Sequence, residues 1–207
     1  IVQREERAFL NTGTSGAAYW DSSLSAKKRK EQRRQRKRLA EEGSLAIMRD
    51  STANGLDRWV RDFLDLERAG WKGEAGSALA CDPRTAALFG QALAGAAARG
   101  RLERLSLTLD GIPIAMLANF LTPPGAFSFK TTFDERYARY SPGVLLQQEN
   151  LSAPGREGID WCDSCASANH PMIDHIWRER RPIGRMSIAI GGPLRRAAFA
   201  GILRAER

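Results

Sequence analysis

The clearest hydrophobic pattern in the chain is a helical one. Five apolar residues recur at positions i, i+3, i+4, i+7 and i+8, namely Leu56, Trp59, Val60, Phe63 and Leu64. This spacing places them on one face of a helix that Gly70 ends, so it predicts an amphipathic helix packed against a core. A second helix is predicted over residues 84–98, an alanine-rich run that ends at Gly100, and the intervening residues 71–80 are expected to form a loop.

Alternating apolar and polar residues then predict strands. Leucine alternates with Ser and Thr over residues 105–109, and Asp110-Gly111 separates this run from the apolar run 112–117. Asp-Gly readily adopts the positive φ angles of a type I′ turn, so the two runs predict a β-hairpin. The aromatic-rich run 126–133 predicts a third strand, and residues 45–48 are short enough for another.

Strands and helices alternate in the last third of the chain. After a polar loop, Ser141 is a suitable N-cap and Pro142 a suitable first residue for a helix with Val144, Leu145 and Leu151 on its apolar face. The other expected elements are a strand at 158–163, a helix at 172–180, a strand at 183–190 and a basic helix at 193–206. A hairpin followed by these alternating elements predicts an α/β fold in which helices cover a mixed sheet.

Length and composition favour a single domain. The chain has 207 residues, of which 43% are hydrophobic, and this is enough for one substantial core. Residues 24–207 are expected to form the domain, and residues 1–23 an N-terminal arm or the remnant of an upstream domain. The aromatic residues of this arm are expected either to pack on a neighbouring domain or to fold back: Phe9, Tyr19 and Trp20.

The sequence favours a cytoplasmic location. It contains no apolar run of about eighteen residues, and its first residues do not resemble a signal peptide. The chain starts without Met, so an upstream part or a processed start is expected. Its cysteines are odd in number and too few for a disulfide framework, which favours a reducing compartment: Cys81, Cys162 and Cys165. A peripheral position on the inner face of the membrane is the alternative.

One segment accounts for the net charge of the chain. Residues 27–38 contain nine basic residues and one acid, a local charge of +8 (9 − 1), and the whole chain also sums to +8. Ser25 is a suitable N-cap, and no apolar residue occurs between Ala26 and Leu39. The sequence therefore predicts a basic surface helix over residues 25–42.

This density of like charge has three interpretations. A solvated surface helix is the simplest, but nine cations in twelve residues repel one another and usually indicate an anionic partner. Nucleic acid is not favoured, because no aromatic residues are interleaved for base stacking. An anionic acceptor and the anionic membrane surface fit equally well. For an acceptor, the expected contacts are Lys28, Arg29 and Arg33.

Several side chains near the predicted strand ends are candidates for chemistry. Asp134 and Glu135 follow the third strand, where a carboxylate could take the proton of an acceptor; solvated loop acids are the alternative. Asp163 and His170 lie at and beyond the end of the next strand, where ligands gather in open sheets. Lys130 lies within the third strand, and because a buried lysine is rarely left unpaired, we expect it to contact acceptor or cofactor.

The segment that begins at Trp161 is similar to two known motifs, one within residues 161–165 and one over residues 162–175. The segment imitates a thioredoxin motif, but the downstream chain is too short to build that fold. A zinc-knuckle-like spacing joins Cys162, Cys165, His170 and His175. These four side chains diverge if residues 158–163 form a strand and 172–180 a helix, so no metal site is expected.

Taken together, the element order and several short motifs resemble a known family. The motifs are Leu-Ser-Ala-Lys-Lys-Arg-Lys at 24–30, Gly-Trp-Lys-Gly at 70–73, Phe-Lys-Thr-Thr-Phe-Asp-Glu at 129–135, Tyr-Ser-Pro-Gly-Val-Leu-Leu at 140–146, Asp-Ser-Cys-Ala at 163–166 and His-Pro-Met-Ile-Asp at 170–174. The chain is similar to GNAT acyltransferases, in the branch associated with cellulose biosynthesis (CelD/BcsL-like). The resemblance extends from about Tyr19 to Ile190.

The resemblance implies transfer of an acetyl or other acyl group from a coenzyme A thioester to an amine or hydroxyl, without a metal, in exopolysaccharide or cell-envelope metabolism. It places pantetheine between strands 126–133 and 158–163. It places the pyrophosphate on the amides that lead into the central helix, from Tyr140, Ser141, Gly143, Val144 and Leu145. The usual glycine-rich loop is replaced by Arg139-Tyr-Ser-Pro-Gly143, so Arg136 and Arg139 are expected to assist as phosphate partners.

Two related functions share this fold. A Fem-type transferase would use aminoacyl-tRNA and hold it on the basic helix. A non-catalytic binding module would keep the fold and lose the chemistry. An upstream domain or a second copy of the chain is a further expected partner.

Overall fold

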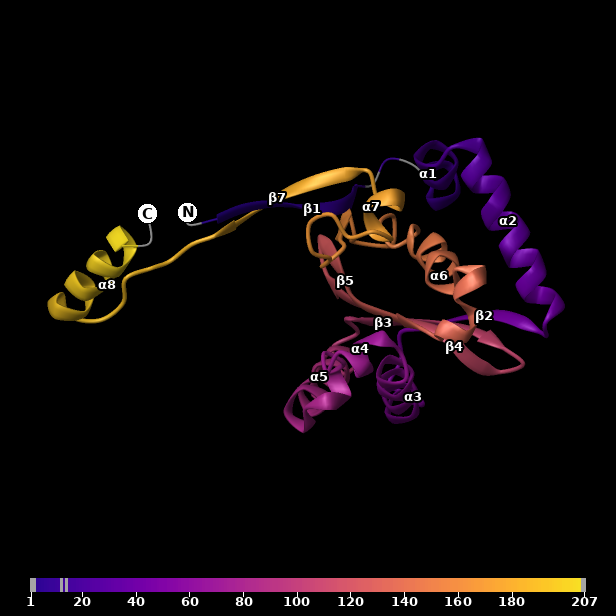
Figure 1. The fold of residues 1–207 in the computed structure, drawn as a ribbon, viewed down its shortest axis with the longest axis horizontal. Coiled ribbons are helices and arrows are strands. Elements are labelled where there is room, and N and C mark those ends of the chain that lie inside the picture. The colour runs from indigo at the N-terminus through magenta and orange to yellow at the C-terminus, as the bar shows by residue number, and fades with distance from the viewer. Residues whose placement is uncertain (1–2, 12, 14, 206–207) are drawn as a thin grey trace.

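The computed structural model describes residues 3–11, 13 and 15–205, and these form one seven-stranded sheet with helices on both faces (Figure 1). The strand order is β2-β3-β4-β5-β6-β1-β7, and β5 and β6 are parallel while the other neighbours are antiparallel. The predicted mixed sheet is confirmed. The strands are β1 Gln3–Asn11, β2 Leu45–Asp50, β3 Leu102–Leu109, β4 Ile112–Thr122, β5 Gly125–Phe133, β6 Trp161–Asp163 and β7 Glu179–Arg185.

The helices divide between the two faces of the sheet (Figure 1). One face carries α3 Leu56–Arg68, α4 Trp71–Glu74 and α5 Pro83–Ala97. The other face carries α1 Gly16–Ser23, α2 Ala26–Glu41, α6 Pro142–Asn150 and α7 Ile173–Ile176. The last helix, α8 Pro193–Ala205, lies apart from the sheet beyond β7. Two 3₁₀ turns complete the chain, η1 Leu79–Cys81 and η2 Glu135–Tyr140.

Two apolar clusters hold the central strands between their helices. On one face, Phe63 and Phe89 of α3 and α5 pack against Met116 of β4. On the other face, Leu145 and Leu146 of α6 pack on β3 and β4. Leu39 is the only buried residue of α2, so this helix lies on the surface with its cations outward, as the sequence predicts.

Several local predictions are confirmed in detail. The hairpin turn has positive φ at both Asp110 (50°) and Gly111 (79°), as a type I′ turn requires. The Ser25 hydroxyl accepts the amide of Lys28 at 3.3 Å and so caps α2. The predicted loop 71–80, in contrast, contains α4 and the start of η1, and the polar loop before Ser141 contains η2.

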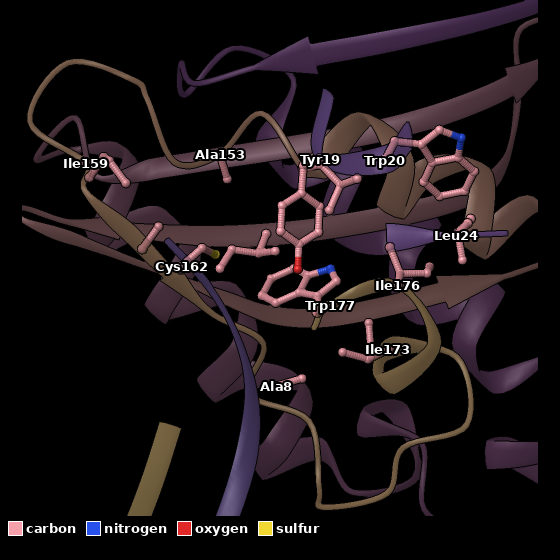
Figure 2. Packing of buried hydrophobic residues seen from close by; sticks show 13 residues of the cluster. Ala8, Tyr19, Trp20, Leu24, Ala153, Ile159, Cys162, Ile173, Ile176 and Trp177 are labelled. Carbon is pink, nitrogen blue, oxygen red and sulfur yellow. The ribbon is translucent and has the colours of Figure 1, made fainter. Parts of the chain in front are cut away.

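The N-terminal segment belongs to the same fold as the rest of the chain. β1 lies between β6 and β7 in the sheet. Tyr19 and Trp20 are buried in a third cluster with Trp177 (Figure 2), so a boundary at residue 23 would cut through a core and is not found there. Of the two alternatives for these aromatics, folding back is the one that the structure shows. Residues 1, 2, 12 and 14 lie outside the described residues.

The predictions for residues 158–190 require correction. The strand expected at 158–163 is only three residues long, the helix expected at 172–180 ends at Ile176, and the strand expected at 183–190 begins at Glu179. The reason is long-range pairing: β7 takes its register from β1, from Phe9↔Glu179 to Gln3↔Arg185. The expected basic helix 193–206 corresponds to α8, and residue 206 lies outside the described part.

Within the described residues, no helix is both long and apolar enough to cross a membrane.

Candidate functional site

Two parallel strands part in the middle of the sheet. β5 and β6 pair over three positions, Gly125↔Trp161, Ala126↔Cys162 and Phe127↔Asp163. After Asp163 the chain leaves β5 and pairs with β1 instead: the Ser164 amide donates to the Ala8 carbonyl at 3.1 Å. The edge of β5 that faces β6 is therefore open over residues 128–133.

A cavity of about 750 Å³ lies at this open edge. Its walls come from both faces of the sheet: α3 and α4 on one side, Gln147 of α6 on the other, and the segments 164–167 and 170–173. A bulge in β5 helps to shape it, because Asn119 pairs with Ser128 but the preceding residue of β4 pairs with Lys130, which leaves Phe129 as an extra residue.

A buried carboxylate with two lysines forms the wall on the α3 side. The Glu67 side chain is fully buried and accepts hydrogen bonds from the Leu79 amide (2.8 Å), Lys72 Nζ (3.1 Å) and Lys130 Nζ (2.9 Å). Burial by itself raises the pKa of Glu67, but these three donors outweigh it and the pKa is lowered. Two ammonium groups share one carboxylate, so this wall carries one excess positive charge.

The imidazole of His170 presents a proton donor to the cavity. The amides of Met172 and Ile173 donate to His170 Nδ1 at 3.3 Å, so the neutral ring carries its proton on Nε2. Burial lowers the pKa of His170 and the charge of Lys72 lowers it further, while Asp174 acts in the opposite direction. At neutral pH His170 is therefore an uncharged hydrogen-bond donor.

A chain of polar side chains fixes α6 beside the cavity. Gln147 Nε2 donates to Thr131 Oγ1 at 3.0 Å, and Asn150 Nδ2 donates to Gln147 Oε1 at 3.3 Å. Asn119 Nδ2 then donates to both Asn150 Oδ1 (2.7 Å) and Glu103 Oε2 (2.9 Å). Because these groups are buried, their mutual hydrogen bonds specify one position of α6 against β4 and β5.

The sequence that forms this cavity also matches a known protein family. Residues 26–170 match the family model described as an acetyltransferase (GNAT) domain, and this range is more than half of the 207 residues. The chain belongs to the GNAT acetyltransferase family. The match supports the acyltransferase class, and it includes α2 through the segment that carries His170.

One solved structure has a similar fold at low sequence identity, and a second is similar over about half of the chain. A conserved protein of unknown function from Bacteroides thetaiotaomicron is 10% identical with a TM-score of 0.52, over 78% of this chain and 52% of that chain. The GNAT chain thus spans about half the length of that relative. The PaiA N-acetyltransferase from Thermoplasma acidophilum, solved with coenzyme A, is 15% identical with a TM-score of 0.39, over 55% of this chain and 75% of that chain. No curated protein sequence matches the chain.

The GNAT cavity contains only some of the residues predicted from sequence. Lys130, Glu135 and His170 line it. Glu135 Oε1 accepts the Trp71 amide at 2.8 Å, so its carboxylate is held at the α4 side. Asp134 does not face this cavity, because its carboxylate is bound on both oxygens by Arg136, at 3.0 and 2.6 Å. That interaction lowers the pKa of Asp134.

Asp163 has a structural position in this GNAT domain. Its side chain is buried, accepts the Cys165 amide at 2.8 Å and lies 3.6 and 3.7 Å from the guanidinium groups of Arg7 and Arg181. These contacts tie β6 to β1 and β7. The structure thus places Asp163, which was predicted as an acceptor-site group, in contact with β1 and β7 and not among the residues that line the cavity.

The amide cradle expected at the start of α6 is only partly present. Ser141 has φ 53° and its side chain makes no cap hydrogen bond, in contrast to the prediction. The amides of Val144 and Leu145 both donate to the Ser141 carbonyl, at 2.9 and 3.1 Å, and Pro142 has no N–H. Gly143 is left to supply a free amide here.

Two side chains cover this glycine. A Cβ on Gly143 would lie 3.2 Å from Met172 Sδ and 3.2 Å from the Phe133 ring. Tyr140 and Arg139 are also engaged, since both bond to Glu42, at 2.9 Å for the guanidinium. The arginines predicted to assist phosphate thus pair with acids of this chain.

The predicted acceptor contacts on α2 lie outside the large cavity. Lys28 borders a smaller hollow beside Val144 and Met172. Arg29 donates to the carbonyl groups of Asp21 and Leu24, so it secures the link between α1 and α2. Arg33 borders a shallow groove along α2.

The zinc-like spacing does not converge on one point. In the described part of the chain, no three metal-ligating side chains lie together. Cys162 is buried in the apolar cluster of β1 and α7, while His175 is exposed. Burial raises the pKa of Cys165 to about 11, so its thiol stays protonated.

Sequence reasoning missed Glu67, Lys72 and Gln147. A signal for Glu67 was present, because it follows Phe63 by four residues and so lies on the apolar face of the α3 helix. A carboxylate on a buried stripe is rarely left unpaired. Lys72 lies in the Gly-Trp-Lys-Gly motif, but its partner could be identified only from the fold.

Proposed function

We propose that this protein transfers an acyl group, with acetyl as the first choice, from acyl-CoA to an amine or hydroxyl acceptor in the cavity beside β5. The observation that carries the proposal is the parting of β5 and β6. On the edge of β5 that faces β6, it leaves backbone N–H and C=O groups of residues 128–133 without a strand partner among the described residues. Apart from the Thr131 carbonyl, which accepts from Lys72 Nζ, these groups can pair with the two amides of an extended pantetheine arm.

The cavity offers groups for both halves of the reaction. The acceptor's lone pair attacks the thioester carbonyl carbon, the C–S bond breaks, and its electron pair leaves on the coenzyme A sulfur, which then takes up a proton. The Nε2–H of His170, which lines the cavity, is the proposed hydrogen-bond donor to the oxygen that becomes negative. Glu135, at the α4 side of the cavity, is the proposed base for the acceptor proton.

The α3 side of the cavity is the proposed entrance for the acceptor. Trp71, Lys72 and Lys130 line it, and each lysine has N–H donors beyond those that bind Glu67 and, for Lys72, the Thr131 carbonyl at 3.2 Å. The short motifs shared with the cellulose-biosynthesis-associated branch support an acceptor in exopolysaccharide or cell-envelope metabolism, and a cytoplasmic site for the reaction.

Calorimetric titration with acetyl-CoA tests the proposal. Ala166 lines the cavity, so Ala166→Trp should fill it and weaken binding by at least about tenfold, a loss of about 1.4 kcal/mol. Ala87→Trp on exposed α5 is the matched control and should bind as the wild type does. If millimolar acetyl-CoA produced no heat of binding and no thermal shift, the proposal would be contradicted.

A binding module without catalysis is the second candidate. The observation in its favour is the covered start of α6, where Gly143 alone keeps a free amide and Met172 and Phe133 lie against it. Release of free coenzyme A thiol from acetyl-CoA in the presence of amine acceptors distinguishes the two. A module would bind the thioester without accelerating its loss.

A further inference from the structure

We infer that the basic helix α2 binds the phosphate groups of the donor, with Lys28 as the first contact. This inference rests on the proposed function, since it takes the pantetheine arm to lie along β5. In this inference α2 binds a small molecule that carries a nucleotide, and it does not bind a macromolecule or the acceptor.

The structure leaves few phosphate ligands at the place where the family motif would put them. Pro142 has no N–H, and the next two amides after Gly143 are satisfied by the Ser141 carbonyl. The two nearby arginines pair with acids, Arg136 with Asp134 and Arg139 with Glu42. A diphosphate that leaves the cavity must therefore find its cations elsewhere.

A second hollow of about 220 Å³ adjoins the large cavity on the α2 side. The two share Pro171 and Met172 in their walls, so they are neighbours, and a ligand that passes over Met172 would reach the second hollow. There it meets Lys28 and Gln32 of α2. Figure 1 shows α2 along the outer side of α6, on the same face of the sheet.

The polar groups in this hollow suit a nucleotide. Gln32 Oε1 is buried and has no hydrogen-bond donor among the described residues, so a ligand N–H or O–H would satisfy it. No acid among these residues lies within ion-pair distance of Lys28. An exposed ammonium that has no ion-pair partner in the described chain and borders this hollow favours a phosphate.

The charge continues beyond Lys28. Lys28 and Glu31 also border the shallow groove along α2, where Glu31 is paired with Arg34 at 2.7 Å. The other cations of the groove have no acid within ion-pair distance in the described chain: Lys27, Lys30, Arg33 and Lys37. The phosphate groups of one donor could therefore contact Lys28 in the second hollow and further cations along the groove of α2.

Calorimetry with three ligands tests the inference: coenzyme A, its 3′-dephospho form and pantetheine, which lacks the nucleotide. Lys28→Gln should weaken binding of coenzyme A about three- to tenfold, the range between an exposed and a charge-assisted contact. Pantetheine binding should not change. Lys28→Arg should restore most of the loss, because the cation is kept.

Arg38→Gln is the matched control, since it removes one charge from the same helix about 15 Å further along its axis. It should leave all three affinities unchanged. The inference is overturned if Lys28→Gln weakens pantetheine equally, weakens neither ligand, or acts no more strongly than Arg38→Gln. Loss of binding to phosphatidylglycerol vesicles with unchanged coenzyme A affinity would also overturn it and assign α2 to a membrane.

The same titrations separate this inference from the proposed function. If the wild type binds neither coenzyme A nor pantetheine, the acyltransferase proposal itself fails. If the wild type binds both coenzyme A and pantetheine, and Lys28→Gln changes the two affinities equally, only the assignment of α2 fails. Gln has a high helix propensity and Lys28 is exposed, so the variant is expected to fold.

Discussion

The side chains around the cavity act on one another through charge. Lys72 pairs with buried Glu67, and its charge still disfavours the protonated form of His170. The local arrangement therefore keeps an uncharged imidazole beside a cationic wall. This is the state that the proposed role of His170 as a hydrogen-bond donor requires.

Removing the charge of Lys72 should raise the pKa of His170. In Lys72→Met the imidazolium loses a repulsive neighbour, so it persists to higher pH and the acid limb of any activity profile moves the same way. NMR titration of the imidazole in a His175→Gln background, which leaves one histidine, measures the shift. Lys130→Met is the control, because Lys130 binds the same Glu67 but does not perturb His170. An unchanged or lowered pKa in Lys72→Met would show that the cation does not act there.

The sequence predicted the contacts of some site residues better than those of others. Lys130 was predicted to contact acceptor or cofactor, since a lysine inside a strand is rarely left unpaired, and in the structure it pairs with Glu67 of the same chain. Asp134 and Asp163 carry a carboxylate as Glu135 does, and all three lie at or just beyond the end of a strand. Which acid faces the cavity depends on the arginines that neutralise the other two, and those contacts arise from the fold.

At the scale of elements, two serines were predicted to cap helices and only one does. Ser25 has an extended backbone and accepts the amide of Lys28, whereas Ser141 has φ 53° and no cap hydrogen bond. The 3₁₀ turn η2 leads into Ser141 and fixes this conformation. The residue type was therefore a correct signal for the boundary of α6 but not for how it is capped.

Alanine at each position should separate the two cases. Ser25→Ala loses the cap of α2 and should lower the free energy of unfolding by about 1 kcal/mol. Ser141→Ala removes no cap bond and should cost less than about 0.5 kcal/mol. Urea denaturation followed by circular dichroism gives both values. Equal losses would mean that the Ser25 hydroxyl does not stabilise α2.

For the whole molecule, α8 and the segment before it stand outside the core. α8 has no buried residue, and Leu194 and Ile202 are 88% and 58% exposed. Trp177, by contrast, is fully buried in the cluster that joins α1, β1 and α7 (Figure 2). The fold therefore depends on the chain up to β7, and α8 contributes little to it.

Deleting residues 193–207 should change the free energy of unfolding by less than about 0.5 kcal/mol, because no residue of α8 is buried. Trp177→Ala is the comparison and should cost about 3–5 kcal/mol. Chemical denaturation measures both. A loss of several kcal/mol on deletion would show that α8 packs on the domain in solution.

The sequence by itself determined the elements whose signals are local. The stripe of α3, the Asp-Gly hairpin, the Ser25 cap and the surface position of α2 follow from spacing, turn chemistry and charge within a few residues of one another. The family resemblance extended this to the fold class. These features were predictable because short-range sterics and the need to bury one face decide them.

The family resemblance placed pantetheine between residues 126–133 and 158–163, but only the tertiary structure shows how these two strands part. β1 pairs Phe9 with both Asp163 and Glu179, partners more than 150 residues away, and thereby draws the chain off β5 after Asp163. The same pairing moves β7 and shortens α7. A polar N-terminal strand carries little local signal, and its register depends on which distant edge is free, so the opening beside β5 could not be derived from the pattern of the sequence.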